Sequence, residues 1–350
     1  MQRKERLYAG YGDMPELQIP AQYARRALLR AAVFDTCGQE AAPTSASTVL
    51  TGVLTGVSRH SIAVHGGAGE QVLSLTPATV VWLGTQVTPS ALRVGDLVII
   101  RHQPRRAGAD GPAPAVAERI WARIGRASGT IVAAEGRAEP EFLVDVGRQG
   151  GAERVVVAGA SLRRIQVRFP RLAPGYLIDV IGTRHRGYLL AVAPATAQPP
   201  YRAGQPPAPP RSVGRLADPI SGTAVWHEPV DEPAGLLGLA YPELDPETHP
   251  ETDYRAAGHA RAVADHGCVR LPYLSLGSTV RVRNECTHRA VVLPVTSRGV
   301  IARQFCDRCL ACGTSPKGRV ADLTMAAFVE LGGNLEDGCF NATLGLADWN

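Results

Sequence analysis

The stretch LPYLSLGSTVRVRNECTHRAVVLPVTSRGV, residues 271–300, leads through a cysteine-rich insert to GRVADLTMAAFVELGGNLEDGCFNATLGL, residues 318–346. Residues 278–283 and 290–295 are rich in β-branched side chains and alternate in polarity, so each is expected to form a strand with one buried face. The polar residues between them favour a turn. This half of the region is therefore predicted to be a hairpin.

The second half is expected to continue with a helix and a closing strand. Thr324 is a predicted N-cap, because it precedes apolar residues that repeat at helical spacing as far as Leu331. Gly332 and Gly333 follow the last apolar residue, where glycine commonly ends a helix. Residues 340–346 alternate again and predict the last strand.

This order of segments resembles the double-psi β-barrel of the rare lipoprotein A family, relatives of the expansins and barwin. The resemblance covers about the last third of the chain. The segments that carry it are LP at 271–272, LGSTVRVRN at 276–284, VVLPVTSRG at 291–299, RVADLTMAAFVELGG at 319–333 and, as a first strand, SGTAVWHEP at 221–229. Residues 234–257, which are rich in acids, are expected to form a long surface loop inserted into this barrel.

The resemblance implies a barrel that binds glycan strands of the bacterial cell wall, which some members also cleave. The cleaving members use a Glu after the first strand, a His before the LP motif and an Asp in an N-D-R-G motif. Here the His corresponds to His266 and the Glu to Glu243 or Glu251, but Ser297 occupies the position of the Asp. Because serine supplies no carboxylate, we expect glycan binding without cleavage. A lytic transglycosylase that uses His266 with one of the two glutamates is the alternative.

The same resemblance points to the side chains that would line a glycan groove. They are Trp226, His227, Arg298 and Asp322. Trp226 is equally compatible with stacking on a sugar and with plain core packing. Asp322 matches an aspartate that in the family caps the structure or lines the groove.

Seven cysteines are present, and Cys37 stands apart from the other six. Those six fall in the barrel region and are Cys268, Cys286, Cys306, Cys309, Cys312 and Cys339. An even set confined to one small domain indicates a disulfide framework, and hence an extracellular or cell-surface protein, with fifteen possible pairings. A zinc or redox site at the C-x2-C-x2-C run of residues 306–312 is the alternative, with His266 or Cys286 as a fourth zinc ligand, and an iron–sulfur cluster ranks behind it. No cofactor is predicted.

Residues 48–193 contain an internal repeat, in which each copy shows five short strands and a leucine-x-x-Gly turn before a fully apolar strand. Such spacing predicts two small barrels of the OB or SH3-like kind, resembling tandem β repeats of exported bacterial proteins. Their aromatic residues Trp82, Trp121, Phe142 and Tyr176 are too scattered to predict a ligand-binding face. We therefore expect these modules to be spacers or interaction surfaces.

The predicted fold is mainly β, with two tandem barrels, a double-psi barrel and a short N-terminal helical arm. The expected divisions are an arm at 1–47, barrels at 48–124 and 125–193, a proline-rich extended linker at 194–212 and the last domain at 213–350. The arm, including Cys37, is either a docking helix or a contact for self-association.

The composition narrows the class of partner. The net charge is +5, and no dense basic patch alternates with aromatic residues, which argues against nucleic acid and leaves cell-wall glycan or a surface polymer. No apolar run reaches 18 residues, so no transmembrane segment is expected. No apolar segment typical of an export signal follows the basic N-terminus either.

Overall fold

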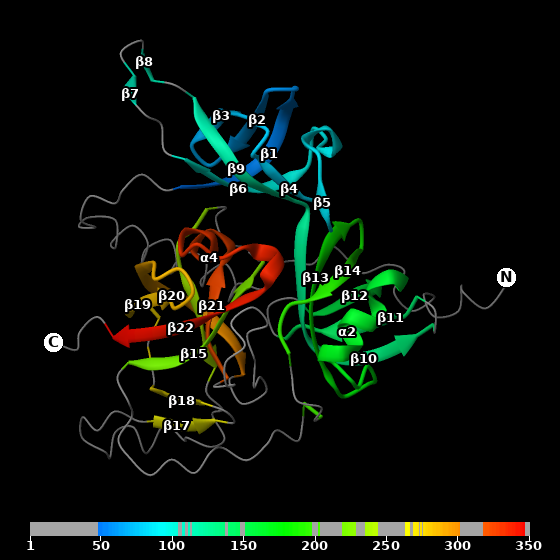
Figure 1. Cartoon of the computed structure of the whole chain (residues 1–350). Helices are drawn as coiled ribbons and strands as arrows, with labels where there is room; N and C mark the ends of the chain where they lie inside the picture. The colour runs from blue at the N-terminus through cyan, green and yellow to red at the C-terminus, as the bar shows by residue number, and fades with distance from the viewer. Residues whose placement is uncertain are drawn as a thin grey trace, which may run out of the picture. The chain divides into compact units, whose positions relative to one another are not determined.

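The computed structural model describes most of the chain from Thr48 onward. The described residues are 48–103, 107–108, 111–112, 114–136, 139–147, 151–197, 202–203, 219–228, 235–243, 263–266, 269–272, 274, 276–301 and 318–346. Strands dominate them, and the helices are few and short, which confirms the mainly-β prediction (Figure 1). Within the described residues, no helix has the length and hydrophobicity needed to cross a bilayer.

The first barrel is a ring of five strands in the order β3-β2-β1-β6-β9, in which β9 closes onto β3 in parallel. Two further strands, β4 and β5, extend the sheet beyond β9. The strands of the ring are β1 (Val49–Val57), β2 (Ser61–Gly66), β3 (Gly69–Ser74), β6 (Leu97–Gln103) and β9 (Ala115–Ala122). The additional elements are β4 (Val80–Trp82), β5 (Gln86–Val87), the 3-10 helix η1 (Pro89–Ala91) and a small hairpin of β7 (Ala107–Gly108) and β8 (Gly111–Pro112).

The second barrel repeats this topology strand for strand. Its ring is β12-β11-β10-β13-β14, and β14 again closes in parallel onto the third strand, β12. The elements are β10 (Ile124–Glu135), β11 (Glu141–Asp145), β12 (Ala152–Val157), η2 (Gly159–Ser161), α2 (Leu162–Arg168), β13 (Leu177–His185) and β14 (Tyr188–Pro194). This is the strand order of an OB barrel, with a helix between the third and fourth strands. The matching rings confirm the internal repeat.

The third barrel is a closed ring of six strands in the order β15-β21-β16-β20-β19-β22, with β15–β21 and β16–β20 parallel. Its strands are β15 (Ile220–His227), β16 (Leu239–Glu243), β19 (Thr279–Asn284), β20 (Ala290–Ile301), β21 (Arg319–Thr324) and β22 (Cys339–Leu346). It also carries α4 (Met325–Glu330), η4 (Leu335–Asp337) and a separate hairpin of β17 (Val263–His266) and β18 (Val269–Pro272). The predicted strands and helix are therefore all present.

One prediction about this barrel is wrong. Residues 239–243 were expected to belong to an acidic surface loop, but they form β16, which lies in the ring between β21 and β20. The reason is that Leu239, Ala240 and Tyr241 are all buried, so the strand has no polar face and no alternation to reveal it. Residues 244–257 lie outside the described part of the chain.

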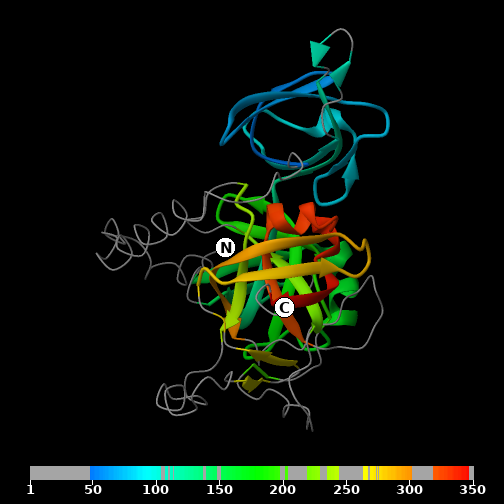
Figure 2. The same ribbon diagram turned by 90° about the vertical axis from the view of Figure 1, so that its left-hand side faces the viewer.

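Side-chain hydrogen bonds fix the turn and helix that the sequence predicts. Thr324 accepts a hydrogen bond from the Ala327 backbone at 3.3 Å, as an N-cap should. The β19–β20 turn belongs to the orange hairpin in Figure 2. In this turn the Asn284 side chain accepts a hydrogen bond from the backbone N–H of Cys286 at 2.8 Å. The Asn284 amide also donates to the carbonyl of Leu331 at 3.1 Å, so it ties the turn to the end of α4.

The first barrel shares its core with the third. Trp82, Ile99 and Trp121 belong to the same hydrophobic cluster as Trp226 and Leu335. Polar contacts reinforce this cluster, because the side chains of Trp121 and Arg119 both donate to the Glu336 carboxylate. The barrel is thus fixed to the third domain by burial as well as by hydrogen bonds.

A buried ionic cluster joins the second barrel to the third. Asp179 of β13 accepts from Arg126 of β10 at 2.8 and 2.6 Å, from Arg319 of β21 at 2.8 Å and from Thr196 at 3.0 Å. Arg126 also donates to two carbonyls of the third barrel, those of Trp226 at 2.9 Å and Gly338 at 2.8 Å. Because these charges are removed from water, they require one another as partners.

This contact corrects the predicted role of the proline-rich linker. The segment from Pro194 was expected to be an extended linker that separates the two small barrels from the last domain. Instead Pro194 ends β14, and Ala195 and Thr196 are fully buried, with Ala195 in the hydrophobic cluster of the third barrel. Of the remaining linker, only Ala197, Arg202 and Ala203 are among the described residues.

Candidate functional site

Four neighbouring strands of the third barrel bring predicted site residues into one row. Val225 of β15 pairs with Asp322 of β21, Asp322 with Ala240 of β16, and Ala240 with Ser297 of β20. Residues paired across strands place their side chains on the same face of the sheet. Asp322 and Ser297 therefore flank the small side chain of Ala240, about 10 Å apart at the usual strand spacing. All four residues are buried.

His227 extends this row at its β15 end. It follows Val225 by two residues, so it lies on the same face of the strand, and its Nδ1 is 3.3 Å from Oδ1 of Asp322. Burial alone would raise the pKa of Asp322, but contact with His227 and the positive charges of Arg319 and Arg126 lower it below the ordinary value. Asp322 is therefore ionised at neutral pH.

Ser297 supplies the other polar group of the row. Its side chain is 1% exposed, and within the described part of the chain its Oγ has no hydrogen-bond partner. A buried hydroxyl without a partner costs about 1–3 kcal/mol. The position therefore favours a polar atom of a ligand or a water molecule beside Ser297. We call His227, Asp322, Ala240 and Ser297 the polar row.

Trp226 does not belong to the polar row. It pairs with Leu323, is fully buried, and donates from its indole nitrogen to the Leu335 carbonyl at 2.9 Å. The guanidinium of Arg126 lies 5.6 Å from the ring centroid. Trp226 is thus a core residue on the opposite face of β15 from Asp322 and His227, which corrects its assignment to a glycan groove.

For the other predicted site residues, the structure gives at most the position of the backbone. Glu243 is the last residue of β16, His266 the last residue of β17, and Arg298 pairs with Tyr241 across β16 and β20. The hairpin that carries His266 contacts β21 through β18, so it lies beside the strand of Asp322. Glu251 lies outside the described residues, and the side-chain positions of Glu243, His266 and Arg298 are not among the described features.

Two of the barrel cysteines lie in the described part of the chain. Cys286, exposed at the turn after β19, takes part in a disulfide, and Cys339 is buried at the start of β22. Cys37, Cys268, Cys306, Cys309 and Cys312 lie outside the described ranges, so the predicted framework and its alternatives at 306–312 stay predictions. In the described ranges, no group of three or more His, Cys, Asp or Glu could hold a metal ion.

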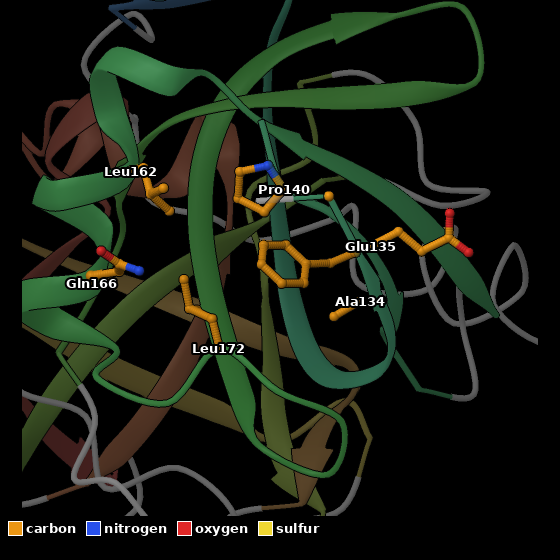
Figure 3. Close-up of a pocket in the computed structure, with 8 residues that line it drawn as sticks. Ala134, Glu135, Pro140, Leu162, Gln166 and Leu172 are labelled. Carbon is orange, nitrogen blue, oxygen red and sulfur yellow. The ribbon is translucent and has the colours of Figure 1, made fainter. Parts of the chain in front are cut away.

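A pocket of about 410 Å³ lies elsewhere, in the second barrel between α2 and the adjoining ends of β10 and β11. Its lining combines apolar side chains with the polar side chains of Glu135 and Gln166. In Figure 3 the Glu135 carboxylate points away from the other labelled side chains. The lining residues are Ala134, Glu135, Gly136, Pro140, Phe142, Leu162, Gln166 and Leu172. None of the predicted site residues lines it, and the one charged residue in its lining is Glu135.

Comparison with protein-family models found no match, and comparison with curated proteins found none either. The site is therefore interpreted from its own geometry. Sequence reasoning named His227, Asp322 and Ser297 but missed Ala240, which lies between Asp322 and Ser297 in the row. The signal for Ala240 was absent, because Leu239, Ala240 and Tyr241 form a short buried run with no alternation of polarity.

The lowered pKa of Asp322 predicts a specific pH dependence of stability. A carboxyl whose pKa is lower in the folded state stabilises that state above its unfolded pKa of about 4, and this contribution disappears as pH falls through the folded pKa. We expect Asp322→Asn to be less stable than the wild type at pH 7, with the difference shrinking below about pH 4. Urea unfolding at several pH values measures this, and a difference that stays constant down to pH 2.5 would contradict it.

Proposed function

We propose that this protein is a non-catalytic, extracellular cell-wall protein that binds glycan through the polar row of its third barrel. The observation that carries the proposal is the pairing of an ionised Asp322 with His227, two strands away from a buried Ser297 hydroxyl. Carboxylate and hydroxyl oxygens are groups that bind sugar hydroxyls. The resemblance of the region to the rare lipoprotein A barrel supports the same class of ligand.

The chemistry of the polar row favours binding over cleavage. A glycosidic bond needs a proton donor, usually a carboxylic acid whose pKa is raised toward neutrality. The pKa of Asp322 is shifted in the opposite direction, and Ser297 replaces the acid that the resemblance implies. Neither residue can therefore donate the proton at neutral pH.

The disulfide at Cys286 supports a location outside the cytoplasm. Disulfides persist mainly in oxidising compartments such as the cell surface. We propose that the remaining barrel cysteines complete a framework of this kind. Mapping the pairs by mass spectrometry of the unreduced protein tests it, and free thiols throughout residues 306–312 would contradict it.

Incubation with isolated sacculi tests both the binding of glycan and the absence of cleavage. We expect the oxidised protein to sediment with the sacculi and to release no anhydro-muropeptides, as measured by mass spectrometry of the supernatant. Asp322→Asn and Ser297→Val should each weaken sedimentation by about tenfold, because each removes a hydrogen-bonding group worth about 1–2 kcal/mol.

Two outcomes would contradict the proposal. Release of anhydro-muropeptides would make the protein a lytic transglycosylase, a candidate favoured by the contact of the His266 hairpin with β21. His266→Ala should then abolish release. Failure of the folded wild type to sediment would remove glycan as the ligand. Glu285→Gln, on the β19–β20 turn away from the polar row, is the matched control for a loss of charge.

A further inference from the structure

A row of side chains also crosses the outer surface of the second barrel. Leu143 of β11 pairs with Arg154 of β12, and Tyr188 of β14 pairs with His185 of β13. Val155, which follows Arg154, pairs with Leu189, which follows Tyr188, across the parallel strands β12 and β14. This register places Arg154 next to Tyr188. We call Leu143, Arg154, Tyr188 and His185 the stacking strip.

The stacking strip faces outward. The flanking residues Phe142, Val144, Val155 and Leu189 are buried in the barrel core, so the alternating residues between them point to the surface. Leu143 is 39% exposed and the side chain of Arg154 is 42% exposed. Tyr188 and His185 are half-buried, so the strip is open to a ligand at Leu143 and Arg154 and along the exposed parts of the two rings.

The side chains of the stacking strip form a stacked platform. The rings of His185 and Tyr188 are almost parallel, at 6° with centroids 4.9 Å apart, and the Arg154 guanidinium lies 5.5 Å from the Tyr188 centroid. Glu141 receives a hydrogen bond from Arg154 at 2.8 Å, which holds the guanidinium in place. Because Arg154 and His185 lie on the strands to either side of Tyr188, they cover the faces of its ring and leave the edge of a rigid stack for a ligand to contact.

We propose that the stacking strip is a second carbohydrate-binding surface, which holds a sugar ring against its aromatic and aliphatic side chains. In OB barrels the second and third strands and the loop between the fourth and fifth bind oligosaccharides or oligonucleotides. Here those elements are β11, β12 and the β13–β14 hairpin, which carry the stacking strip. The proposal takes its ligand class, cell-wall glycan, from the proposed function but uses a different barrel.

The charges near the stacking strip favour carbohydrate over a nucleic acid strand. Single-stranded nucleic acid needs several cations that follow its phosphates. Arg154 is paired with Glu141, and Arg184 is paired with both Glu153 and Glu228. Among the described residues of these strands and their hairpin, Arg186 at the hairpin tip is one further cation, which does not make a track for a phosphate backbone.

Substitution of the two rings tests the proposal on the full-length, oxidised protein. We expect Tyr188→Leu and His185→Ala to weaken binding to sacculi by about tenfold each, the size of effect that loss of one stacking partner has in other platforms. Tyr188→Phe keeps the stack and should bind like the wild type. The matched control is Tyr176→Leu, which removes a tyrosine of the same barrel that also lies under an arginine, Arg202, at 5.8 Å.

The outcomes separate this proposal from the proposed function. Wild-type binding that Tyr188→Leu and His185→Ala leave unchanged would overturn the stacking strip and leave the polar row intact. Failure of the wild type to bind sacculi would overturn both. Binding of the oligonucleotide dT12 that is lost in His185→Ala, while binding to sacculi is kept, would overturn the choice of carbohydrate. Thermal unfolding of each variant identifies losses that come from misfolding.

Discussion

Replacement of Asp179 with asparagine is expected to destabilise the protein by about 3–5 kcal/mol, the range for a buried ionic cluster that loses one partner. Asp179 is fully buried and accepts hydrogen bonds from Arg126, Arg319 and Thr196. The asparagine would keep the volume of the side chain but remove its charge. Two buried guanidinium groups would then lose the carboxylate that accepts hydrogen bonds from both of them, and removing one charge from a buried ionic cluster is costly.

Urea unfolding at pH 7 measures this loss against matched variants. Glu141→Gln breaks the exposed pair with Arg154 and should change the free energy of unfolding by about 1 kcal/mol or less. Thr196→Val removes one neutral donor to Asp179 and should cost about 1 kcal/mol. If Asp179→Asn were no worse than Glu141→Gln, the cluster would not be what fastens the second barrel to the third.

The buried cluster also connects the second barrel to the polar row. Arg126 and Arg319, which Asp179 holds in place, are among the charges that lower the pKa of Asp322. Arg126 comes from the second barrel, so the ionisation of a residue in the third barrel depends on how the two are joined. A module that served only as a spacer would not contribute in this way.

Local patterns in the sequence predicted the elements well. Alternation of polarity located β19 and β22, and Thr324 marked the start of α4 because an N-cap is a property of a few neighbouring residues. The repeat was visible because both copies place short strands and a leucine-x-x-Gly turn in the same order along the chain. The strand β16 was missed, because a strand buried on both faces reads as a short apolar run that periodicity cannot assign.

Contacts between distant segments could not be predicted in this way. Arg126 and Asp179 are 53 residues apart, and Asp179 and Arg319 are 140 residues apart, on different barrels. The stacking strip is equally hidden, because Arg154 meets Tyr188 only through the register of a parallel pair. The register between strands is set by tertiary packing. The spacing of these residues along the chain therefore does not predict that they come into contact.

Trp226→Ala is expected to cost about 3–5 kcal/mol of stability, the usual range for truncation of a large aromatic residue in a core. The ring is fully buried in the cluster that the first and third barrels share, and its nitrogen donates to Leu335. Removal of the indole would leave a cavity and a carbonyl without its donor. Thermal and urea unfolding measure the loss, and a change below about 1 kcal/mol would contradict the core assignment.

Trp226→Phe separates the core role from any role in binding. Phenylalanine keeps most of the buried surface but lacks the donor to Leu335, so we expect a smaller loss of stability, about 1–3 kcal/mol. Because the ring offers no face to a ligand, the folded variant should still sediment with sacculi as the wild type does. A folded Trp226→Phe protein that no longer bound sacculi would contradict this expectation and support the assignment of Trp226 to the glycan groove. The ring would then have to become accessible when glycan binds.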